Sequence, residues 1–284
     1  MAITNLTLVL GDQLTPDTGT LKDAVPAGTH VLMAEVGDEA SYVRHNRHKI
    51  ALIFSAMRHF RDELRSLGFR VTYFAYEDGI GSLTEALDRA IEGEGFTTVS
   101  CCEVGEYRVQ QLLEDWSSRS GVPLEWVADD RFLCSTQEFQ AWAQGRKAFR
   151  MEHFYRVMRR RYEILLDDQG EPEGDRWNYD QENRAGWRAK DEVPQRLEID
   201  RDEITREVLE LVAAAFADNP GDLSRFNLAV TREGDHSQLD FFIEHCLERF
   251  GQYQDALAEE SDWLYHSLVC LLYTSDAADE CCGG

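Results

Sequence analysis

Acidic and amide side chains end or follow three short apolar stretches, at residues 6–10, 29–36 and 96–102. They are Asp12 and Gln13, Glu35 and Glu39, and Glu103 and Glu106. If the stretches are parallel strands, their carboxyl ends meet at one edge of a sheet, where open α/β sheets bind ligands. Carboxylates there would accept hydrogen bonds from a neutral, donor-rich ring and would repel a phosphate. Polar residues also follow strands without any functional role, so both interpretations stay open.

Two motifs for other chemistry are incomplete or missing. Gly79, Ile80 and Gly81 precede a predicted helix, but they lack the third glycine of a dinucleotide fingerprint and do not follow the first strand. The sequence also has no phosphate-binding P-loop and no serine in a Gly-x-Ser-x-Gly elbow. These absences argue against a dinucleotide site and against hydrolase chemistry.

A basic segment stands out in an acidic chain. Residues 145–162 contain seven arginines and lysines but one acid, Glu152, and four aromatic side chains lie between them. Arginines with interleaved aromatics can hold a nucleic-acid backbone. A helix between domains, whose arginines pair with acidic surface, explains the same pattern equally well.

Histidines and cysteines give no metal site. His45 and His48 share a face of a predicted helix, but no cysteine is near enough to join them as a ligand. Four cysteines precede residue 269, and none of them forms a Cys-x-x-Cys pair. They are Cys101, Cys102, Cys134 and Cys246.

The last residues differ in character from the rest. The run from Cys270 to Glu280 resembles a translated transposon-type adapter from a sequencing library. We expect residues 269–284 to be a non-native tail and the natural sequence to be interrupted near Leu268, although a frayed natural terminus is the alternative.

Composition narrows the class of protein. The chain has 284 residues, of which 43% are hydrophobic, enough to bury a core. No run approaches the ~20 apolar residues of a membrane helix, and the first ten residues lack the features of a secretory signal. The net charge of −24 repels DNA at long range. We expect a cytoplasmic monomer that contacts no membrane.

Apolar periodicity predicts the elements that position these residues. Five short strand-like stretches alternate with helical patterns up to residue 132, which indicates right-handed βαβ units and a parallel sheet. The capping-box pattern that begins at Ser82 opens one of these helices. Further helices are predicted later in the chain, with an irregular connection at 167–193. Their expected ranges are 135–143, 149–166, 204–216 and 239–250.

Several stretches of the sequence match one known family. They are residues 8–14, 39–43, 49–51 with 53–60, 131–133, 145–147, 151–152 with 154–156 and 158–160, and 176–178 with 180 and 182–184. In these stretches the chain resembles the cryptochrome/photolyase superfamily, in its iron–sulfur bacterial branch of prokaryotic (6-4) photolyases. The resemblance extends over residues 5–268. It implies a Rossmann-like α/β antenna domain at 1–132, interdomain helices and linker at 133–193, and the truncated start of an all-helical FAD domain at 194–268.

The resemblance also implies cofactors and site residues. Family members hold FAD, a 4Fe-4S cluster and often a ribityllumazine antenna, and light-excited reduced FAD passes an electron to a pyrimidine lesion in UV-damaged DNA. The cluster cysteines and most of the flavin pocket would lie beyond Leu268. The implied antenna residues are Gly11, Asp12 and Glu39, with Glu35, Tyr42 and Ile53 as weaker candidates. The segment His266, Ser267 and Leu268 resembles the opening of the FAD phosphate segment, and the nucleic-acid candidates are Arg156, Arg159, Arg160 and Arg184.

Three functions follow in order of preference. The first is a DNA photolyase, a carbon–carbon lyase when whole, of which this chain would hold mainly the antenna domain and be inactive alone. The second is a non-repair, cryptochrome-type blue-light photoreceptor of the same fold. The third is a plain small-ligand-binding α/β module.

Overall fold

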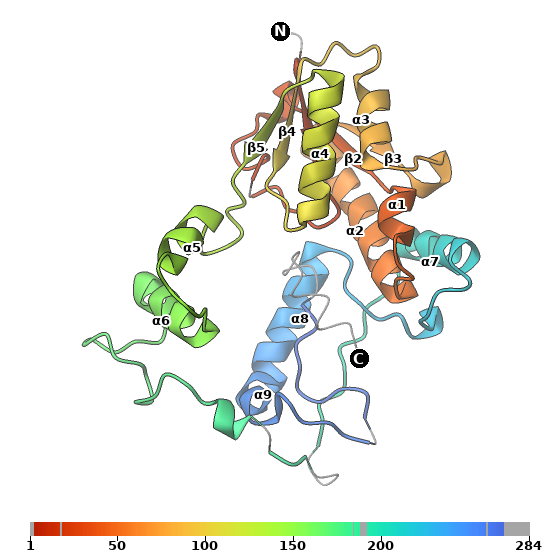
Figure 1. The fold of residues 1–284 in the computed structure, drawn as a ribbon. Coiled ribbons are helices and arrows are strands. Elements are labelled where there is room, and N and C mark those ends of the chain that lie inside the picture. The colour runs from red at the N-terminus through yellow and green to blue at the C-terminus, as the bar shows by residue number, and fades with distance from the viewer. Residues whose placement is uncertain (1–2, 18, 184, 188–191, 260, 270–284) are drawn as a thin grey trace. The chain divides into compact units, whose positions relative to one another are not determined.

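The computed structural model describes residues 3–17, 19–183, 185–187, 192–259 and 261–269 (Figure 1). Contacts divide the chain into two compact units. The α/β unit comprises the residues up to Asp129, Leu197–Leu239 and the described residues from Leu268. The helical unit comprises Asp130–Arg196 and Asp240–Ser267. The domain boundaries expected at residues 132, 193 and 268 stay predictions.

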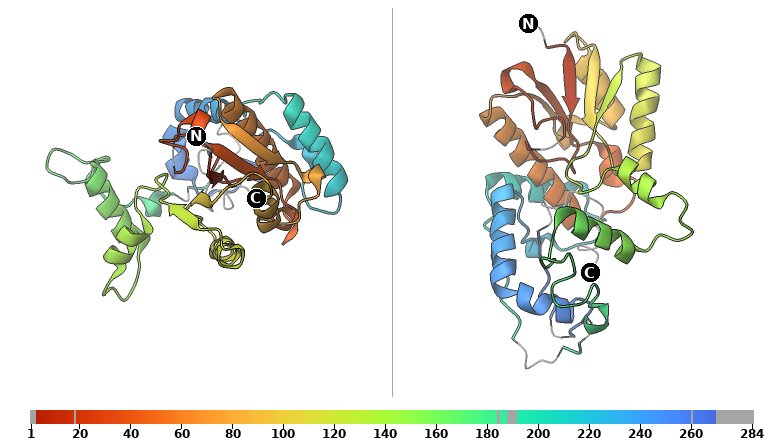
Figure 2. Two further views of the ribbon diagram at one scale, coloured as in Figure 1. Left: turned by 90° about the horizontal axis from the view of Figure 1, so that it is seen from above. Right: turned by 90° about the vertical axis from the view of Figure 1, so that its left-hand side faces the viewer.

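Five parallel strands form the centre of the α/β unit, as the alternating pattern predicted (Figures 1 and 2). They are β1 (Asn5–Leu8), β2 (His30–Ala34), β3 (Arg70–Phe74), β4 (Thr98–Cys102) and β5 (Leu124–Val127). Their order in the sheet is β3-β2-β1-β4-β5. In β1, Leu6 pairs with His30 on one side and with Val99 on the other. The prediction of an α/β fold with a parallel sheet is therefore confirmed.

Alternate residues of the strands enter two different cores. Leu6, Leu8 and Leu32 pack with helices α3 (Leu83–Ile91) and α4 (Tyr107–Ser120) on one face of the sheet. On the opposite face, Val31 and Met33 pack under the long helix α2 (Arg47–Ser66). Side chains alternate between the two faces along a strand, which is why both cores are apolar although they share strands.

Local capping explains where two of these helices begin. The Asn46 side chain accepts a hydrogen bond from the His48 amide at 2.8 Å and starts α2. The Ser82 hydroxyl accepts from the Glu85 amide at 3.1 Å and starts α3, as predicted. The second half of the predicted capping box is wrong, because the Glu85 carboxylate accepts from the Gly81 amide at 2.8 Å.

A helix from late in the sequence belongs to the α/β unit. Helix α7 (Glu203–Ala215) buries Val208 and Val212 in a core shared with Phe54 of α2. The short helix α1 (Gly37–Ser41), which the sequence pattern did not predict, adds Ala40 to this core. Apolar burial on both sides therefore holds α2 between the sheet and α7.

The helical unit contains α5 (Thr136–Ala143), α6 (Met151–Tyr162) and α9 (Leu247–Tyr253). Helix α8 (Arg232–His245) begins in the α/β unit and ends in the helical unit. The single helix predicted for residues 239–250 is wrong, because two helices meet at Cys246. Four 3₁₀ turns complete the described elements: η1 (Pro26–Gly28), η2 (Tyr76–Asp78), η3 (Asp180–Glu182) and η4 (Leu223–Arg225).

Candidate functional site

The strand order predicts a ligand crevice at the carboxyl end of β1. The chain adds β2 and then β3 on one side of β1, and it adds β4 and then β5 on the other side. Where the strand order reverses in this way, the connections after the two adjacent strands lead to opposite faces of the sheet. They are expected to leave a crevice between them at the carboxyl end of the sheet. Three predicted ligand residues, Gly11, Asp12 and Glu39, follow β1 and β2 at this edge.

An ion pair spans this edge. The Arg108 guanidinium, in the first turn of α4, donates to both carboxylate oxygens of Glu39 in α1, at 2.8 and 2.7 Å. A third bond, 2.9 Å long, reaches the Glu106 carboxylate. The guanidinium carbon also lies 4.6 Å from the centre of the Tyr42 ring. The hydrogen bond to Glu39, with the charge of both carboxylates, raises the pKa of Arg108 above its ordinary value despite partial burial.

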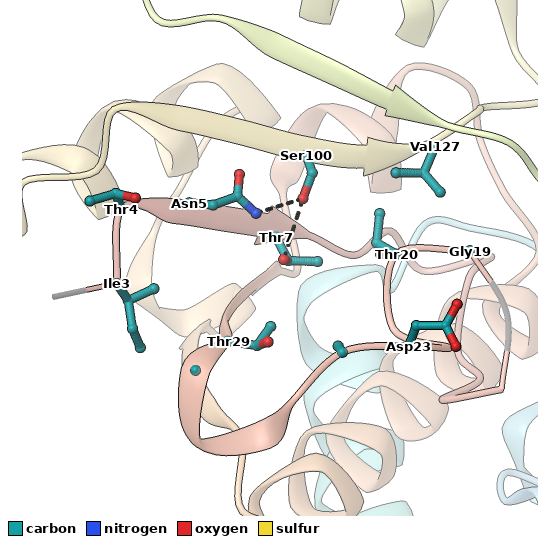
Figure 3. A pocket seen from close by; sticks show the side chains of 12 residues that line it. Ile3, Thr4, Asn5, Thr7, Gly19, Thr20, Asp23, Thr29, Ser100 and Val127 are labelled. Atoms are coloured by element: carbon teal, nitrogen blue, oxygen red, sulfur yellow. Dashed lines mark hydrogen bonds between the residues drawn. The ribbon is translucent and has the colours of Figure 1, made fainter. Parts of the chain in front are cut away.

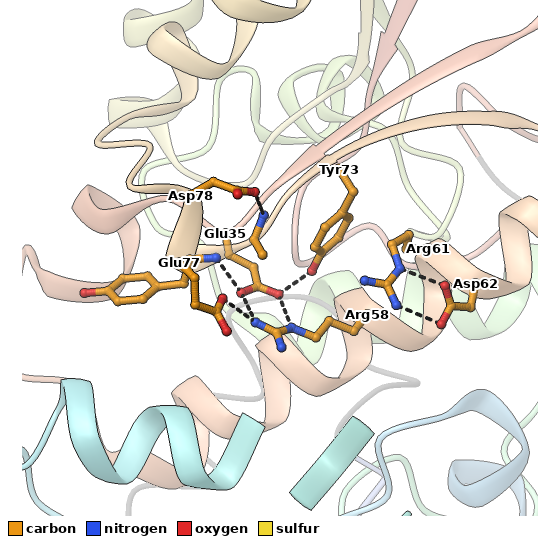
Figure 4. Close-up of polar contacts among 9 residues, drawn as sticks. Glu35, Arg58, Arg61, Asp62, Tyr73, Glu77 and Asp78 are labelled. Atoms are coloured by element: carbon orange, nitrogen blue, oxygen red, sulfur yellow. Dashed lines mark hydrogen bonds and ion pairs between the residues drawn. The ribbon is translucent and has the colours of Figure 1, made fainter. Parts of the chain in front are cut away.

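Glu35 has a different set of partners (Figure 4). Its side chain is fully buried, and its two oxygens accept from Arg58 of α2 at 2.8 and 2.9 Å. It also accepts from the Tyr73 hydroxyl and, at 2.9 Å, from the Tyr76 amide. Burial, followed by the Glu35 charge and hydrogen bond, raises the pKa of Tyr73. The Glu35 carboxylate is therefore saturated inside the protein and cannot accept from a ligand as it stands.

The Glu35 network extends to a second carboxylate. Arg58 also donates to Glu77 in η2, with an Nη2–Oε2 distance of 2.9 Å. Because Glu35 follows β2, Arg58 lies in α2 and Tyr73 lies in β3, the network joins three elements of the α/β unit. Its geometry fixes the chain just before α1, the helix that carries Glu39.

Close packing explains the glycine that follows β1. A Cβ atom on Gly11 would lie 3.0 Å from Cγ2 of Ile53 and 3.2 Å from the Met57 sulfur. Two residues later, the nearly buried Gln13 side chain donates to the Cys102 carbonyl at 3.2 Å and accepts from the Leu10 amide at 3.3 Å. The connection after β1 is therefore attached both to α2 and to β4.

The structure brings only some of the predicted antenna residues together. Gly11 contacts Ile53, and Glu39 and Tyr42 share Arg108. Asp12 is half-buried beside Gly11. Sequence reasoning missed Arg108 and Arg58. The usable signal for Arg108 was its position at the start of the helix that follows β4, since that helix begins at the same edge as Glu39.

A separate polar pocket of about 450 Å³ lies on the α/β unit (Figure 3). It is lined mainly by threonines, Asn5, Ser100 and the connection around Gly19 and Asp23. The Asn5 amide donates to the Ser100 hydroxyl at 2.9 Å. Ser100 also lies 3.4 Å from the Thr7 hydroxyl. These groups satisfy one another, and no sequence motif predicts this pocket.

The arginines of α6 differ in their surroundings within the helical unit. The guanidinium carbons of Arg156, Arg159 and Arg160 lie 5.4, 5.1 and 4.5 Å from the centre of the Trp177 ring. Arg159 is 6% exposed and donates to the carbonyls of Ile164 and Leu165, which stabilises the end of α6. Arg156 pairs with Glu152. Of the nucleic-acid candidates, Arg184 lies outside the described residues.

Ion pairs within the helical unit involve part of the basic segment. Arg161 pairs with Glu138 of α5 at 2.6 Å. This contact and the pair between Arg156 and Glu152 use two of the seven basic side chains. Arg160, stacked on Trp177, is therefore the candidate best placed to contact a partner.

The remaining predicted positions lie near the end of the described chain. The His266 imidazole lies 2.9 Å from the Gln254 carbonyl, and Ser267 and Leu268 are half-buried. Among the described residues, no group of three or more His, Cys, Asp or Glu side chains could hold a metal ion. In the same part of the chain, no helix combines the length and apolar character needed to cross a membrane.

Comparison with known proteins gives the family. The model of the family described as "Deoxyribodipyrimidine photo-lyase-related protein" matches residues 7–228. The chain is 40% identical over 284 residues to the "(6-4) photolyase" of Agrobacterium fabrum (strain C58 / ATCC 33970), covering 98% of this chain and 56% of that protein. It is 20% identical over 151 residues to the "Uncharacterized protein R852" of Acanthamoeba polyphaga mimivirus, covering 52% of this chain and 75% of the relative.

These matches bear directly on the resemblance seen in the sequence. The chain spans about half the length of the Agrobacterium protein. Within that span, the identity extends over nearly the whole chain, and the family model covers most of the α/β unit. The chain belongs to the family of deoxyribodipyrimidine photolyase-related proteins.

Proposed function

We propose that this chain carries the antenna-chromophore domain of a light-driven DNA photolyase. The observation that carries the proposal is the 40% identity to a (6-4) photolyase over 98% of the chain. The whole protein would repair UV pyrimidine photoproducts of the (6-4) type as a carbon–carbon lyase. Because the chain spans 56% of that relative, we propose that it does not repair DNA by itself.

The crevice at the end of β1 suits a ribityllumazine. Glu39 and Glu106 supply acceptors, Arg108 supplies planar donors, and Tyr42 supplies an aromatic face. A polar ring with a hydroxylated chain can use all of these groups. A phosphate would meet two carboxylates within reach of one arginine, which makes nucleotides poorer candidates. Transfer of excitation needs only a fixed position, so no reacting side chain is required.

The other cofactors belong to the proposal for the whole protein. FAD, when bound, would supply the photoexcited electron, and a 4Fe-4S cluster would be held by cysteines outside this chain. The segment His266, Ser267 and Leu268 would begin the FAD phosphate site. Arg156 and Arg160 are the proposed contacts for UV-damaged DNA, whereas Arg159 would support α6. A cytoplasmic location and a monomeric state stay predictions.

The network around Glu35 suggests a supporting role for that residue. Its carboxylate is saturated by Arg58, Tyr73 and the Tyr76 amide. We therefore place Gly11, Asp12, Glu39, Tyr42 and Ile53 around the ligand, and we assign Glu35 to the layer beneath them.

Titration of a ribityllumazine into the 284-residue chain, followed by fluorescence, tests the antenna proposal. We expect saturable binding that Glu39→Ala weakens about tenfold or more, since a hydrogen bond to a charged group is worth roughly 1.5–3 kcal/mol. Glu92→Ala, at an exposed position with no part in the crevice, is the matched control. Absence of binding, or equal affinity for wild type and Glu39→Ala, would contradict the site.

The alternative whole-protein function is a blue-light photoreceptor without repair activity. An antenna domain serves either function, so the α/β unit does not distinguish them. Photoreduction followed by a lesion-repair assay on the longer protein from the same DNA separates the two. A third possibility, a plain small-ligand-binding module, predicts a ligand in the crevice but no energy transfer to flavin.

A further inference from the structure

The pair Glu39–Arg108 joins the two halves of the sheet across its centre. Glu39 lies in α1, which follows β2, and Arg108 lies in α4, which follows β4. The strand between β2 and β4 is β1, and its carboxyl end leads to Gly11. The bidentate contact therefore lies at the edge of the sheet where the strand order predicts that a ligand binds.

The two side chains present a distinctive set of hydrogen-bonding groups. The carboxylate offers two acceptors, and the planar guanidinium offers donors in a fixed fork. In the structure each group satisfies the other, and Glu106 accepts from a further donor of Arg108. Neither side chain is fully buried, with 43% of Arg108 and 30% of Glu39 exposed, so a ligand can reach both.

Two contacts keep Arg108 in position when its bonds to Glu39 change. Its guanidinium lies over the Tyr42 ring, and Glu106 holds one of its terminal nitrogens at 2.9 Å. A guanidinium held on an aromatic face and by a second carboxylate stays oriented when another partner leaves. The crevice therefore has a pre-positioned donor beside a pre-positioned acceptor.

We propose that Arg108 is a specificity-determining residue of the crevice, which exchanges its bond to Glu39 for the imide edge of a planar ring ligand. This inference rests on the proposed antenna function. The imide edge presents a ring N–H flanked by carbonyl oxygens. Glu39 accepts from the N–H, and Arg108 donates to the adjacent carbonyl oxygen, so each side chain gains one charge-assisted bond from the ligand in place of the bidentate contact that it gives up.

The same arrangement disfavours other ligand classes. A phosphate would gain Arg108 but would face Glu39 and Glu106 without a neutralising partner. A metal cation would compete with a guanidinium that already neutralises these carboxylates. A ring without an imide N–H would displace Arg108 from Glu39 without offering the carboxylate a new donor. The loss of a hydrogen bond to a charged group would weaken the binding of such a ring.

The experiment compares two ligands on the whole 284-residue chain. One is a ribityllumazine, and the other is the same lumazine methylated on the imide nitrogen. We expect wild type to bind the methylated ligand about tenfold or more weakly, because a charge-assisted hydrogen bond is lost. We expect Arg108→Met to bind the unmethylated ligand about tenfold more weakly than wild type does.

Controls separate a local effect from unfolding. Arg89→Met removes an exposed arginine paired with Glu85 within α3, and it should leave both affinities unchanged. Arg108→Lys keeps the charge without the planar fork and should bind the unmethylated ligand more weakly than wild type does. The methylated ligand tests the contact on unaltered protein, so the result does not depend on how well a variant folds.

The outcomes distinguish the two proposals. If wild type binds both ligands equally, the antenna site stands and the exchange at Arg108 is overturned. If Arg108→Met binds more tightly than wild type, Arg108 competes with the ligand and the inference is again overturned. If wild type binds neither ligand, the proposed antenna function fails, and this inference fails with it.

Discussion

Glu35 and Arg58 form a bidentate ion pair whose side chains are 0% and 9% exposed, and Glu35 lies two residues before α1, the helix that carries Glu39. The pair connects the end of β2 to the middle of α2. A buried ion pair adds little to the free energy of unfolding, but removal of one partner lowers that free energy strongly because the other charge stays buried alone. The arrangement therefore fixes geometry, and it makes single substitutions severe.

We expect Arg58→Met to lower the free energy of unfolding by about 3–5 kcal/mol, because it leaves the Glu35 carboxylate buried without its cation. Chemical denaturation monitored by circular dichroism measures the change. The double variant Glu35→Leu with Arg58→Met should recover part of the loss. Arg65→Met, at an exposed position of the same helix, is the control and should change stability by less than about 0.5 kcal/mol. A loss below 1 kcal/mol for Arg58→Met would refute the expectation.

Gly11 tests whether the close approach of α2 constrains the crevice. Gly11→Ala places a Cβ atom 3.0 Å from Ile53 and 3.2 Å from Met57, and we expect a loss of about 1–3 kcal/mol. Ile53→Ala alone should also destabilise, but the double variant should lose less than the sum of the two. Gly28→Ala, with no atom within 4 Å of its added Cβ, is the matched control. Strict additivity would show that the two side chains do not meet.

Asp202 gives the contact between α2 and α7 a dependence on pH. Burial raises the pKa of Asp202, but hydrogen bonds from Thr205 and the nearby His59, whose Nε2 lies 3.0 Å away, bring it below its usual value. A lowered carboxyl pKa adds stability above the unfolded-state pKa, and the contribution disappears as the pH falls through the folded-state pKa.

We therefore expect Asp202→Ala to lower stability by about 1 kcal/mol at neutral pH, the typical cost of a lost N-cap. The difference between wild type and variant should shrink below about pH 4, near the ordinary pKa of aspartate. Thermal melts from pH 3 to pH 7 measure it. Asp115→Ala, in the last part of α4, is the comparison variant. A difference that stays constant down to pH 3 would exclude a role for the Asp202 charge.

Arg159 and Arg160 are neighbours in sequence, but we expect their substitutions to affect different properties, namely stability and DNA binding. Arg159→Met should destabilise the helical unit by roughly 1–3 kcal/mol, because the carbonyls of Ile164 and Leu165 lose a charged donor that is itself buried. Arg160→Met should leave stability nearly unchanged. If Arg160 contacts a DNA phosphate, its substitution should reduce the salt dependence of DNA binding by about one unit of slope. Filter binding across a salt series is the measurement. An unchanged slope would remove Arg160 from the proposed DNA surface.

The strands could be predicted because their pattern is local. β2 is an uninterrupted buried run, and β1 and β4 are nearly so, which is how a strand covered on both faces reads in sequence. The break at Cys246 was missed because apolar residues continue through it at helical spacing. Periodicity reports which face is buried, and it does not report where one helix ends and the next begins.

The site was less predictable than the sheet. The position of Glu39 soon after a strand makes it a predictable ligand residue. Arg108 lies 69 residues further along the chain, and only the strand order brings it next to Glu39. Glu35 looked similar to Glu39 in sequence, yet α2 supplies it with Arg58 and removes it from solvent. Burial and pairing of a carboxylate depend on tertiary neighbours that one sequence does not reveal.

The separation of Glu39 and Arg108 along the chain also has a consequence for folding. The contact cannot form until β4 has joined β1, which closes a long loop and comes at an entropic cost. A ligand held by both side chains acts as a reversible cross-link between the early and late parts of the sheet. Its binding energy then opposes separation of the two halves, so ligand bound to both side chains makes opening of the sheet less favourable.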